Sequence, residues 1–382
     1  NHCCMDWSAI YQEPLFYLVT FGLLCSITLL HFLQYARPAF GRYDKNGTSP
    51  EELPGISVVL CVKNEYDNLS VLLPALLEQE YGTFEIVVVD KNSQDDTDVL
   101  LASLEHFHKN LTIRVLSANT KFGQDNLMAL GIGVRAARHP LIVFFRPDCR
   151  PASKKWLSSL VKTKSGTGAD VIMGYTSCDK CNPVIRYDML EQQLHAMGMS
   201  GLKQYYAAGG NNTLFSKEKF IGGHEFDTRT TAYNQSEQAI VSHVLEGSRT
   251  RSCIYPAGTV ILERHIAFRE YHMTRLRSMQ TILLTKGWPY LYLTMDKLLT
   301  ALFYIFLVFT SIRFWEYRNC YTLATLGGML LLRWVTVWIH HAGFRKHLTV
   351  KGLVPAAPLW DVLAPWVHFY FITALVIKKI KD

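Results

Sequence analysis

Charged side chains follow two apolar runs of the sequence. FEIVVVD ends at Asp90, and PLIVFF is followed directly by Arg146 and then by Asp148. A carboxylate at the carboxyl end of a buried strand can accept hydrogen bonds from a base or a ribose. Arg146 and Asp148 follow the second run in the same way. Asp90 is therefore a candidate for binding a nucleoside, although a simple cap of the following turn remains the competing interpretation.

The residue pattern predicts that alternating strands and helices position these side chains. Ile56–Val62 and Phe84–Asp90 are β-branched runs of buried-strand length, separated by an amphipathic stretch over residues 68–80. Two further strands are expected at 112–116 and 140–145, with a helix between them. This alternation favours an α/β fold whose mostly parallel sheet is covered on both faces and carries a site at the carboxyl ends of its strands.

Apolar stretches of membrane-spanning length flank this region. Residues 14–36 contain no Asp, Glu, Lys or Arg, and the stretch is too long for the apolar core of a signal peptide, so we expect an anchor. Further spans are expected near 290–312, 320–339 and 358–377. Four full crossings would place the basic C-terminal tail outside, so either one stretch is interfacial or re-entrant, or the positive-inside rule fails at the tail.

These patterns divide the chain into four parts. They are an anchor with a basic linker at 1–52, an α/β domain at 53–264, an interfacial basic helix region at 265–289, and transmembrane helices at 290–382. The basic segments beside the first and third apolar stretches predict a cytoplasmic α/β domain.

Composition narrows the choice of partners. Of the 382 residues, 49% are hydrophobic and 19% charged, which indicates a mixed soluble and membrane architecture. The net charge of +7 suits anionic partners such as a membrane surface or a nucleoside diphosphate. Nucleic acid is disfavoured, because the basic residues gather beside the membrane segments and do not interleave with aromatic residues.

Nine cysteines are scattered without a repeating framework, which favours a reducing compartment over a disulfide-stapled fold. Cys178 and Cys181 form the one CxxC pair. An ordinary loop is expected there in preference to a structural zinc or redox pair, since no second CxxC lies nearby.

The stretch from Ile56 to Thr97 resembles the opening of the family 2 glycosyltransferases, which have the GT-A nucleotide-sugar fold. The matching motif residues are Asn64, Glu65, Gln79, Tyr81, Asp90, Ser93, Asp95 and Thr97. The resemblance continues through LGIGVRAARHPLIVFFRPDC, GGNNTLFSKEKF and FREYHMTRLRS, and the flanking membrane helices are similar to those of membrane-bound bacterial members.

The resemblance implies a membrane-anchored inverting enzyme that moves a sugar from a nucleoside diphosphate sugar to a lipid-linked or cell-surface glycan acceptor. It also implies an integral protein of the bacterial inner membrane that could work beside a partner glycosyltransferase. Glu237 matches the second acidic position of the general-base motif. The implied donor-binding residues are Glu65, Asp90, Lys121, Arg146, Asp148, Arg275 and Arg277, and the implied acceptor-side residues are Gly210, Asn211 and Asn212.

The family's D-x-D metal motif reads Arg146-Pro-Asp148 in this chain. Mg²⁺ or Mn²⁺ would normally bridge two carboxylates and the diphosphate, so Asp148 alone is a weak metal ligand. Arg146 is expected either to replace part of the metal's charge or to pair with Asp148 and close the site. On the interfacial helix, binding of Arg275 and Arg277 to anionic lipid headgroups is the alternative to binding of phosphate.

Other positions also depart from the family pattern. They are Lys91, Gln124, Asp125, Ser236 and Ser278, in addition to Arg146. So many departures keep a second interpretation open, in which a catalytically degenerate GT-A scaffold binds a nucleotide or a partner and regulates glycan assembly.

Overall fold

The computed structural model of the chain describes residues 15, 17–30, 53–116, 126–201, 210–222, 248–284, 288–316, 320–348 and 352–381. It separates into two units. One comprises residues 37–289 with 346–350, and the other comprises 1–36, 290–345 and 351–382.

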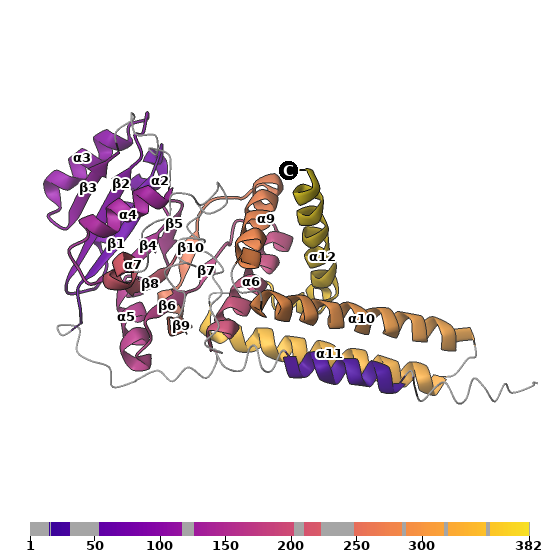
Figure 1. Cartoon of the computed structure of the whole chain (residues 1–382). Helices are drawn as coiled ribbons and strands as arrows, with labels where there is room; N and C mark the ends of the chain where they lie inside the picture. Colours follow the sequence, from indigo (N-terminus) through magenta and orange to yellow (C-terminus); the bar gives the residue numbers. More distant parts are fainter. Residues whose placement is uncertain are drawn as a thin grey trace, which may run out of the picture. The chain divides into compact units, whose positions relative to one another are not determined.

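The first unit contains a seven-stranded sheet in the order β3-β2-β1-β4-β8-β6-β9 (Figure 1). The strands are β1 (Ile56–Val62), β2 (Phe84–Asp90), β3 (Leu111–Val115), β4 (Leu141–Phe145), β6 (Val171–Gly174), β8 (Thr213–Ser216) and β9 (Thr250–Cys253). The first four run parallel to one another, and β8 is antiparallel to both of its neighbours. The mostly parallel α/β sheet predicted from the sequence is confirmed.

Helices α2 (Tyr66–Leu77), α3 (Thr97–Phe107), α4 (Asn126–Ala136) and α5 (Trp156–Thr167) connect these strands. Helix α4 packs on the sheet, where Val134 joins Val59, Val87 and Phe144 in one buried cluster. Gly133 allows this close approach, because a Cβ at that position would lie 2.5 Å from Cγ1 of Val59. Sequence-distant strands are thereby held under one apolar layer.

A second, three-stranded sheet lies in the same unit. Strand β10 (Val260–Leu262) pairs with β5 (Cys149–Pro151) on one side and with β7 (Thr176–Ser177) on the other. The unit also contains α6 (Pro183–Gly201), α7 (Lys217–Gly222), the short 3₁₀ helix η3 (Pro256–Gly258) and α9 (Phe268–Leu284). The small sheet brings the segment after β4 beside the segment that leads into α9.

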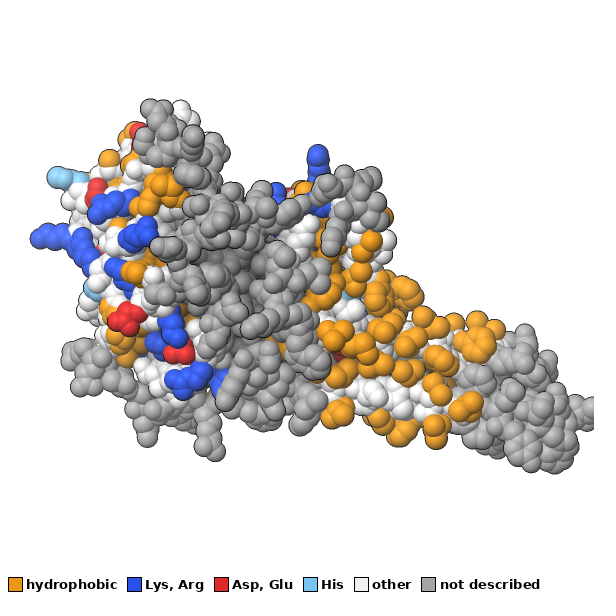
Figure 2. Space-filling model, viewed as in Figure 1, with side chains coloured by type: hydrophobic (Ala, Val, Ile, Leu, Met, Phe, Trp, Pro, Cys, Tyr) orange, Lys and Arg blue, Asp and Glu red, His pale blue; other side chains and the backbone are white. Residues whose placement is uncertain are grey.

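The second unit is helical, with α10 (Trp288–Glu316), α11 (Cys320–His347) and α12 (Ala357–Lys381). Each contains a stretch long and apolar enough to cross a membrane, and Tyr17–Leu30 forms a shorter apolar helix. Figure 2 shows hydrophobic side chains exposed over these helices. Ile305, Phe309 and Ile339 are among the exposed hydrophobic residues of this unit. Such a surface is suited to lipid contact.

Charged groups inside the helical unit are paired. Arg333 of α11 is fully buried, and its Nη2 lies 2.6 Å from Oδ1 of Asp361 on α12. The hydroxyl of Tyr304 on α10 donates to Oδ2 of the same carboxylate at 2.6 Å. This polar contact joins three helices, since a buried charge is stable only when it is paired.

Candidate functional site

The carboxyl ends of β1, β2 and β4 meet at one edge of the large sheet. Strand β1 lies between the other two, with Val62 opposite Asp90 and Leu60 opposite Phe145. The chain order reverses between β1 and β4, which is the place where open α/β sheets bind their ligands. Arg146 directly follows β4 and therefore lies at this switch point.

Hydrogen bonds connect the loops that follow β1 and β2. The backbone N–H of Asn64 donates to Oγ of Ser93 at 2.9 Å, and Oδ1 of Asn64 accepts from the N–H of Gln94 at 2.7 Å. The N–H of Glu65 donates to Oγ1 of Thr97 at 3.1 Å. Asn64 adopts a left-handed φ of 54°, which asparagine tolerates better than most residues. The motif residues thus hold the two loops in one arrangement.

Asp90 lies beneath these loops and is 2% exposed. Its carboxylate accepts from the hydroxyl of Ser93 at 2.6 Å and from the Ser93 N–H at 3.1 Å. It therefore caps the turn, while contact with a nucleoside stays a prediction. Glu65 accepts from Nδ2 of Asn68 at 2.6 Å, and its donor-binding role likewise stays a prediction.

Asp148 is held between two guanidinium groups. Arg146 forms a bidentate fork on it, with Nε to Oδ1 at 3.0 Å and Nη2 to Oδ2 at 2.6 Å. Nε of Arg264 donates to the same Oδ2 at 2.7 Å. The side chain of Asp148 is only 7% exposed, whereas those of Arg146 and Arg264 are 37% and 36% exposed. Both arginines can therefore still be reached from solvent.

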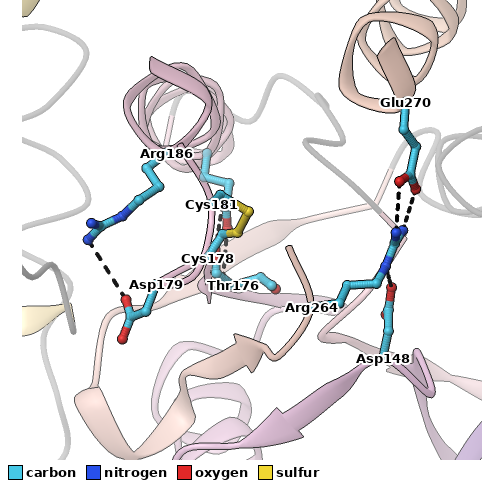
Figure 3. The surroundings of a disulfide bond; sticks show 9 residues. Asp148, Thr176, Cys178, Asp179, Cys181, Arg186, Arg264 and Glu270 are labelled. Carbon is cyan, nitrogen blue, oxygen red and sulfur yellow. Dashed lines mark hydrogen bonds and ion pairs between the residues drawn. A yellow bond between two sulfur atoms is a disulfide. The ribbon is translucent and has the colours of Figure 1, made fainter. Parts of the chain in front are cut away.

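Arg264 also forms a second fork. Its Nη1 and Nη2 donate to the carboxylate of Glu270, in the first turn of α9, at 2.8 and 2.5 Å. Figure 3 shows its guanidinium between Asp148 and Glu270. Asp148, Arg146, Arg264 and Glu270 together are called the arginine–carboxylate cluster below.

The cluster is fully ionised near neutral pH. Burial by itself raises the pKa of Asp148, but the charges and hydrogen bonds of Arg146 and Arg264 outweigh it, and the pKa of Asp148 lies below its ordinary value. The hydrogen bonds from Arg264 likewise lower the pKa of Glu270. Two positive and two negative groups therefore give the cluster a formal charge near zero.

The cluster is positioned by both sheets. The backbone N–H of Glu263, just beyond β10, donates to the Asp148 carbonyl at 3.0 Å, which places Arg264 beside Asp148. The backbone N–H of Arg146 donates to Oδ1 of Asn211 at 3.1 Å. The cluster thus depends on three segments that are far apart in the sequence.

Asn211 and Asn212 differ in their surroundings. Asn212 is fully buried, and its amide donates to the carbonyls of Tyr175 and Gly258 at 2.9 and 3.0 Å while accepting from Nε1 of Trp156 at 2.9 Å. Its side chain is therefore used to join parts of the fold. The acceptor-side roles of Gly210, Asn211 and Asn212 stay predictions.

The two arginines predicted on α9 also differ. Arg275 is 4% exposed, and its Nε lies 3.2 Å from Oδ2 of Asp188 on α6. Gln192 and Tyr271 donate to the same carboxylate oxygen. Arg275 therefore joins α6 to α9 within a buried network, whereas Arg277 is exposed. Binding of phosphate by either arginine stays a prediction.

Two predicted site residues lie outside the described residues, namely Lys121 and the proposed base Glu237. Conversely, the sequence-based predictions missed Arg264 and Glu270. No local pattern connects Arg264 with Asp148, because Asp148 lies 116 positions earlier in the chain.

The CxxC pair departs from expectation. Cys178 and Cys181 form a disulfide in the turn between β7 and α6, where an ordinary loop was predicted (Figure 3). Inside this turn, Nζ of Lys180 lies 3.0 Å from Oε2 of Glu263, which also pairs with Arg150. The crosslinked turn is therefore attached to the residue that precedes Arg264.

The described residues do not fit the divalent metal ion that a D-x-D motif would hold. Among them, no group of three or more His, Cys, Asp and Glu side chains is placed to bind a metal. In the motif itself, both oxygens of Asp148 accept hydrogen bonds from guanidinium groups, and Arg146 stands where the second carboxylate would be.

Comparison with known proteins agrees with this architecture. Residues 57–228 match the model of the family described as Glycosyl transferase family 2. Glycosyltransferase AglE of Haloferax volcanii is 32% identical over 124 residues, which are 32% of this chain and 39% of that protein. Ceramide glucosyltransferase 1 of Caenorhabditis elegans is 26% identical over 156 residues, which are 38% of this chain and 33% of that protein.

A solved structure shares the fold. Mannosyltransferase PcManGT from Pyrobaculum calidifontis, in complex with GDP-Man and Mn²⁺, aligns with a TM-score of 0.50 at 17% identity, over 91% of this chain and 99% of that chain. Residues 57–228 are therefore a family 2 glycosyltransferase domain of GT-A type. The matched segments span only 39% and 33% of the two curated relatives.

Proposed function

We propose that this chain is a membrane-anchored glycosyltransferase that uses a nucleoside diphosphate sugar as its donor. The observation that carries the proposal is the position of Arg146, directly after β4 at the switch point of a family 2 glycosyltransferase domain. The cations of the cluster are suited to a diphosphate, and the polar loops after β1 and β2 are suited to a nucleoside.

The acceptor in this proposal is a lipid-linked or cell-surface glycan. The three helices able to span a membrane support it, because such an acceptor meets the enzyme at the bilayer. We place the α/β domain in the cytoplasm and the protein in a bacterial inner membrane, where a partner glycosyltransferase could act on the same glycan.

In the proposed reaction, Glu237 removes the proton from an acceptor hydroxyl. The hydroxyl oxygen attacks C1 of the donor sugar from the face opposite the diphosphate, and the nucleoside diphosphate leaves with the bonding electron pair. The configuration at C1 is inverted. The positive groups around Asp148 would stabilise the charge that develops on the leaving group.

A specific observation favours a second candidate. Both carboxylate oxygens of Asp148 are occupied by arginines, as expected for a degenerate GT-A scaffold that no longer turns over a donor. Such a protein would bind a nucleotide or a partner and regulate glycan assembly.

Turnover of a panel of nucleotide sugars by the full chain in detergent tests the proposal. Thermal stabilisation measures binding, because a ligand that binds only the folded state raises the midpoint, and release of nucleoside diphosphate measures turnover. Glu237→Gln is expected to abolish turnover and leave binding intact. Glu218→Gln, at an exposed position of α7, is the matched control and should behave as the wild type.

The outcomes separate the two candidates. Turnover that disappears in Glu237→Gln supports the transferase, whereas unchanged turnover removes Glu237 as the base. Binding without turnover for any sugar supports the scaffold. No stabilisation by any nucleotide sugar would contradict donor binding and, with it, the proposed function.

A further inference from the structure

We infer that this chain binds the diphosphate of its donor through the guanidinium groups of Arg146 and Arg264, without a divalent metal ion. We also infer that Glu270 competes with the diphosphate for Arg264. The inference rests on the proposed function and specifies how that site recognises its ligand.

The carboxylate of Asp148 is not available to coordinate a metal ion. A divalent ion in a D-x-D site needs carboxylate oxygens turned toward it, but Oδ1 and Oδ2 of Asp148 accept hydrogen bonds at 2.6 to 3.0 Å from two arginines. An ion at this carboxylate would also face two full positive charges at close range. Repulsion and the loss of strong hydrogen bonds therefore both oppose metal binding at Asp148.

The two arginines can supply the positive charge that a metal ion would otherwise bring. Arg146 and Arg264 together bring the two positive charges that a divalent ion would supply to a diphosphate. Their side chains remain 37% and 36% exposed, so a ligand can reach them, while Asp148 is 7% exposed and fixes their direction. In this arrangement Asp148 orients two cations and does not coordinate a metal.

Glu270 occupies the side of Arg264 that a phosphate group would bind. Its carboxylate accepts hydrogen bonds from both terminal nitrogens of Arg264, at 2.8 and 2.5 Å, and a phosphate group would bind the guanidinium with the same geometry. The Glu270 side chain is 44% exposed, so it can leave this contact and be solvated by water. When it leaves, Arg146, Arg264 and Asp148 retain a net positive charge that attracts the diphosphate.

Arg146 lies at the edge of the sheet where a nucleotide is expected to bind. Arg146 follows β4 at the switch point beside β1, whereas Arg138 precedes the same strand and pairs with Glu85. The two arginines therefore lie beyond opposite ends of β4, and only Arg146 is at the edge where a nucleotide binds. This contrast makes Arg138 a matched control for Arg146.

Isothermal titration of the full chain in detergent with UDP, GDP, CDP and dTDP tests the inference. Each titration is run first with EDTA and then with Mn²⁺. For at least one nucleotide we expect the same affinity in both buffers. Arg146→Gln should weaken that affinity about 10- to 100-fold, as expected from the loss of charge-assisted hydrogen bonds. Arg138→Gln should leave it unchanged, and Glu270→Gln should tighten it.

A charge exchange provides a second variant. Arg146→Asp restores two acidic residues around Pro147 and should abolish binding in EDTA while making binding dependent on Mn²⁺. Thermal unfolding of each variant without nucleotide identifies any that fails to fold. If Arg146→Asp fails, the Glu270→Gln titration still tests the competition, and unchanged or weaker binding in that variant would overturn the role of Glu270.

The possible results distinguish this inference from the proposed function. Binding only in the presence of Mn²⁺ would leave the proposed function standing and overturn the metal-free site. Equal binding by Arg146→Gln and the wild type in EDTA would also overturn it. No binding of any nucleotide in either buffer would contradict donor recognition, and both proposals would fall together.

Discussion

Replacement of Asp148 by asparagine tests how the arginine–carboxylate cluster contributes to stability. The substitution keeps the size of the side chain but removes the charge that two guanidiniums share at 2.6, 2.7 and 3.0 Å. Breaking a buried ion pair costs about 3–5 kcal/mol. Because the amide keeps one acceptor and the arginines are partly exposed, we expect the lower end of that range, about 3 kcal/mol.

For a domain of about 200 residues, 1 kcal/mol lowers the thermal midpoint by roughly 2–4 °C, so Asp148→Asn should lower it by about 6–12 °C. Tryptophan fluorescence can follow the transition, because Trp156 is buried in the same unit. Asp170→Asn is the control, since Asp170 pairs with the exposed Arg249 at 3.8 Å and such pairs contribute about 0–1 kcal/mol. A loss in Asp148→Asn no larger than in the control would refute the buried ion-pair account.

Three further predictions concern stability. The folded-state pKa of Asp148 is below its unfolded value of about 3.9, so its contribution is complete above that pH and disappears as pH falls through the folded pKa; acid unfolding should therefore be less steep in Asp148→Asn than in the wild type. Asn212→Ala removes the acceptor of the Trp156 indole and two donated hydrogen bonds, and chemical denaturation should show a loss of about 2–4 kcal/mol. Asp361→Asn leaves Arg333 buried with a neutral partner, and heating in detergent followed by size-exclusion chromatography should show a lower aggregation temperature than for the wild type. Equally steep acid unfolding of Asp148→Asn and the wild type would contradict the first prediction. A loss of stability under about 0.5 kcal/mol in Asn212→Ala would contradict the second, and an unchanged aggregation temperature in Asp361→Asn would contradict the third.

Local sequence patterns were sufficient for the first half of the large sheet. The β-branched runs at Ile56–Val62 and Phe84–Asp90 coincide with β1 and β2, because parallel strands buried on both faces require continuous apolar residues. The apolar stretches of the C-terminal third similarly coincide with α10, α11 and α12, because a run of about 20 apolar residues is typical of a helix long enough to cross a bilayer.

The partners within the site could not be predicted in the same way. Pairing of Arg146 with Asp148 was one of the two alternatives predicted from the sequence, since the two residues lie in one turn. Arg264, in contrast, is brought beside Asp148 by the small sheet of β5, β10 and β7. Strands as short as β7 and β10 carry little periodic signal. The roles of Asn212 and Arg275 also depend on partners that are distant in the sequence.

Hydrogen–deuterium exchange with and without a saturating nucleotide sugar tests the central claim most directly. The donor should protect backbone amides at the carboxyl edge of the sheet, in the loops after β1 and β2 and in the turn that contains Arg146 and Asp148. Amides at the opposite edge, near Arg138, should exchange as before. Protection confined to that opposite edge, or no protection anywhere in the α/β domain by any donor, would contradict the claim that these strand ends bind an activated sugar.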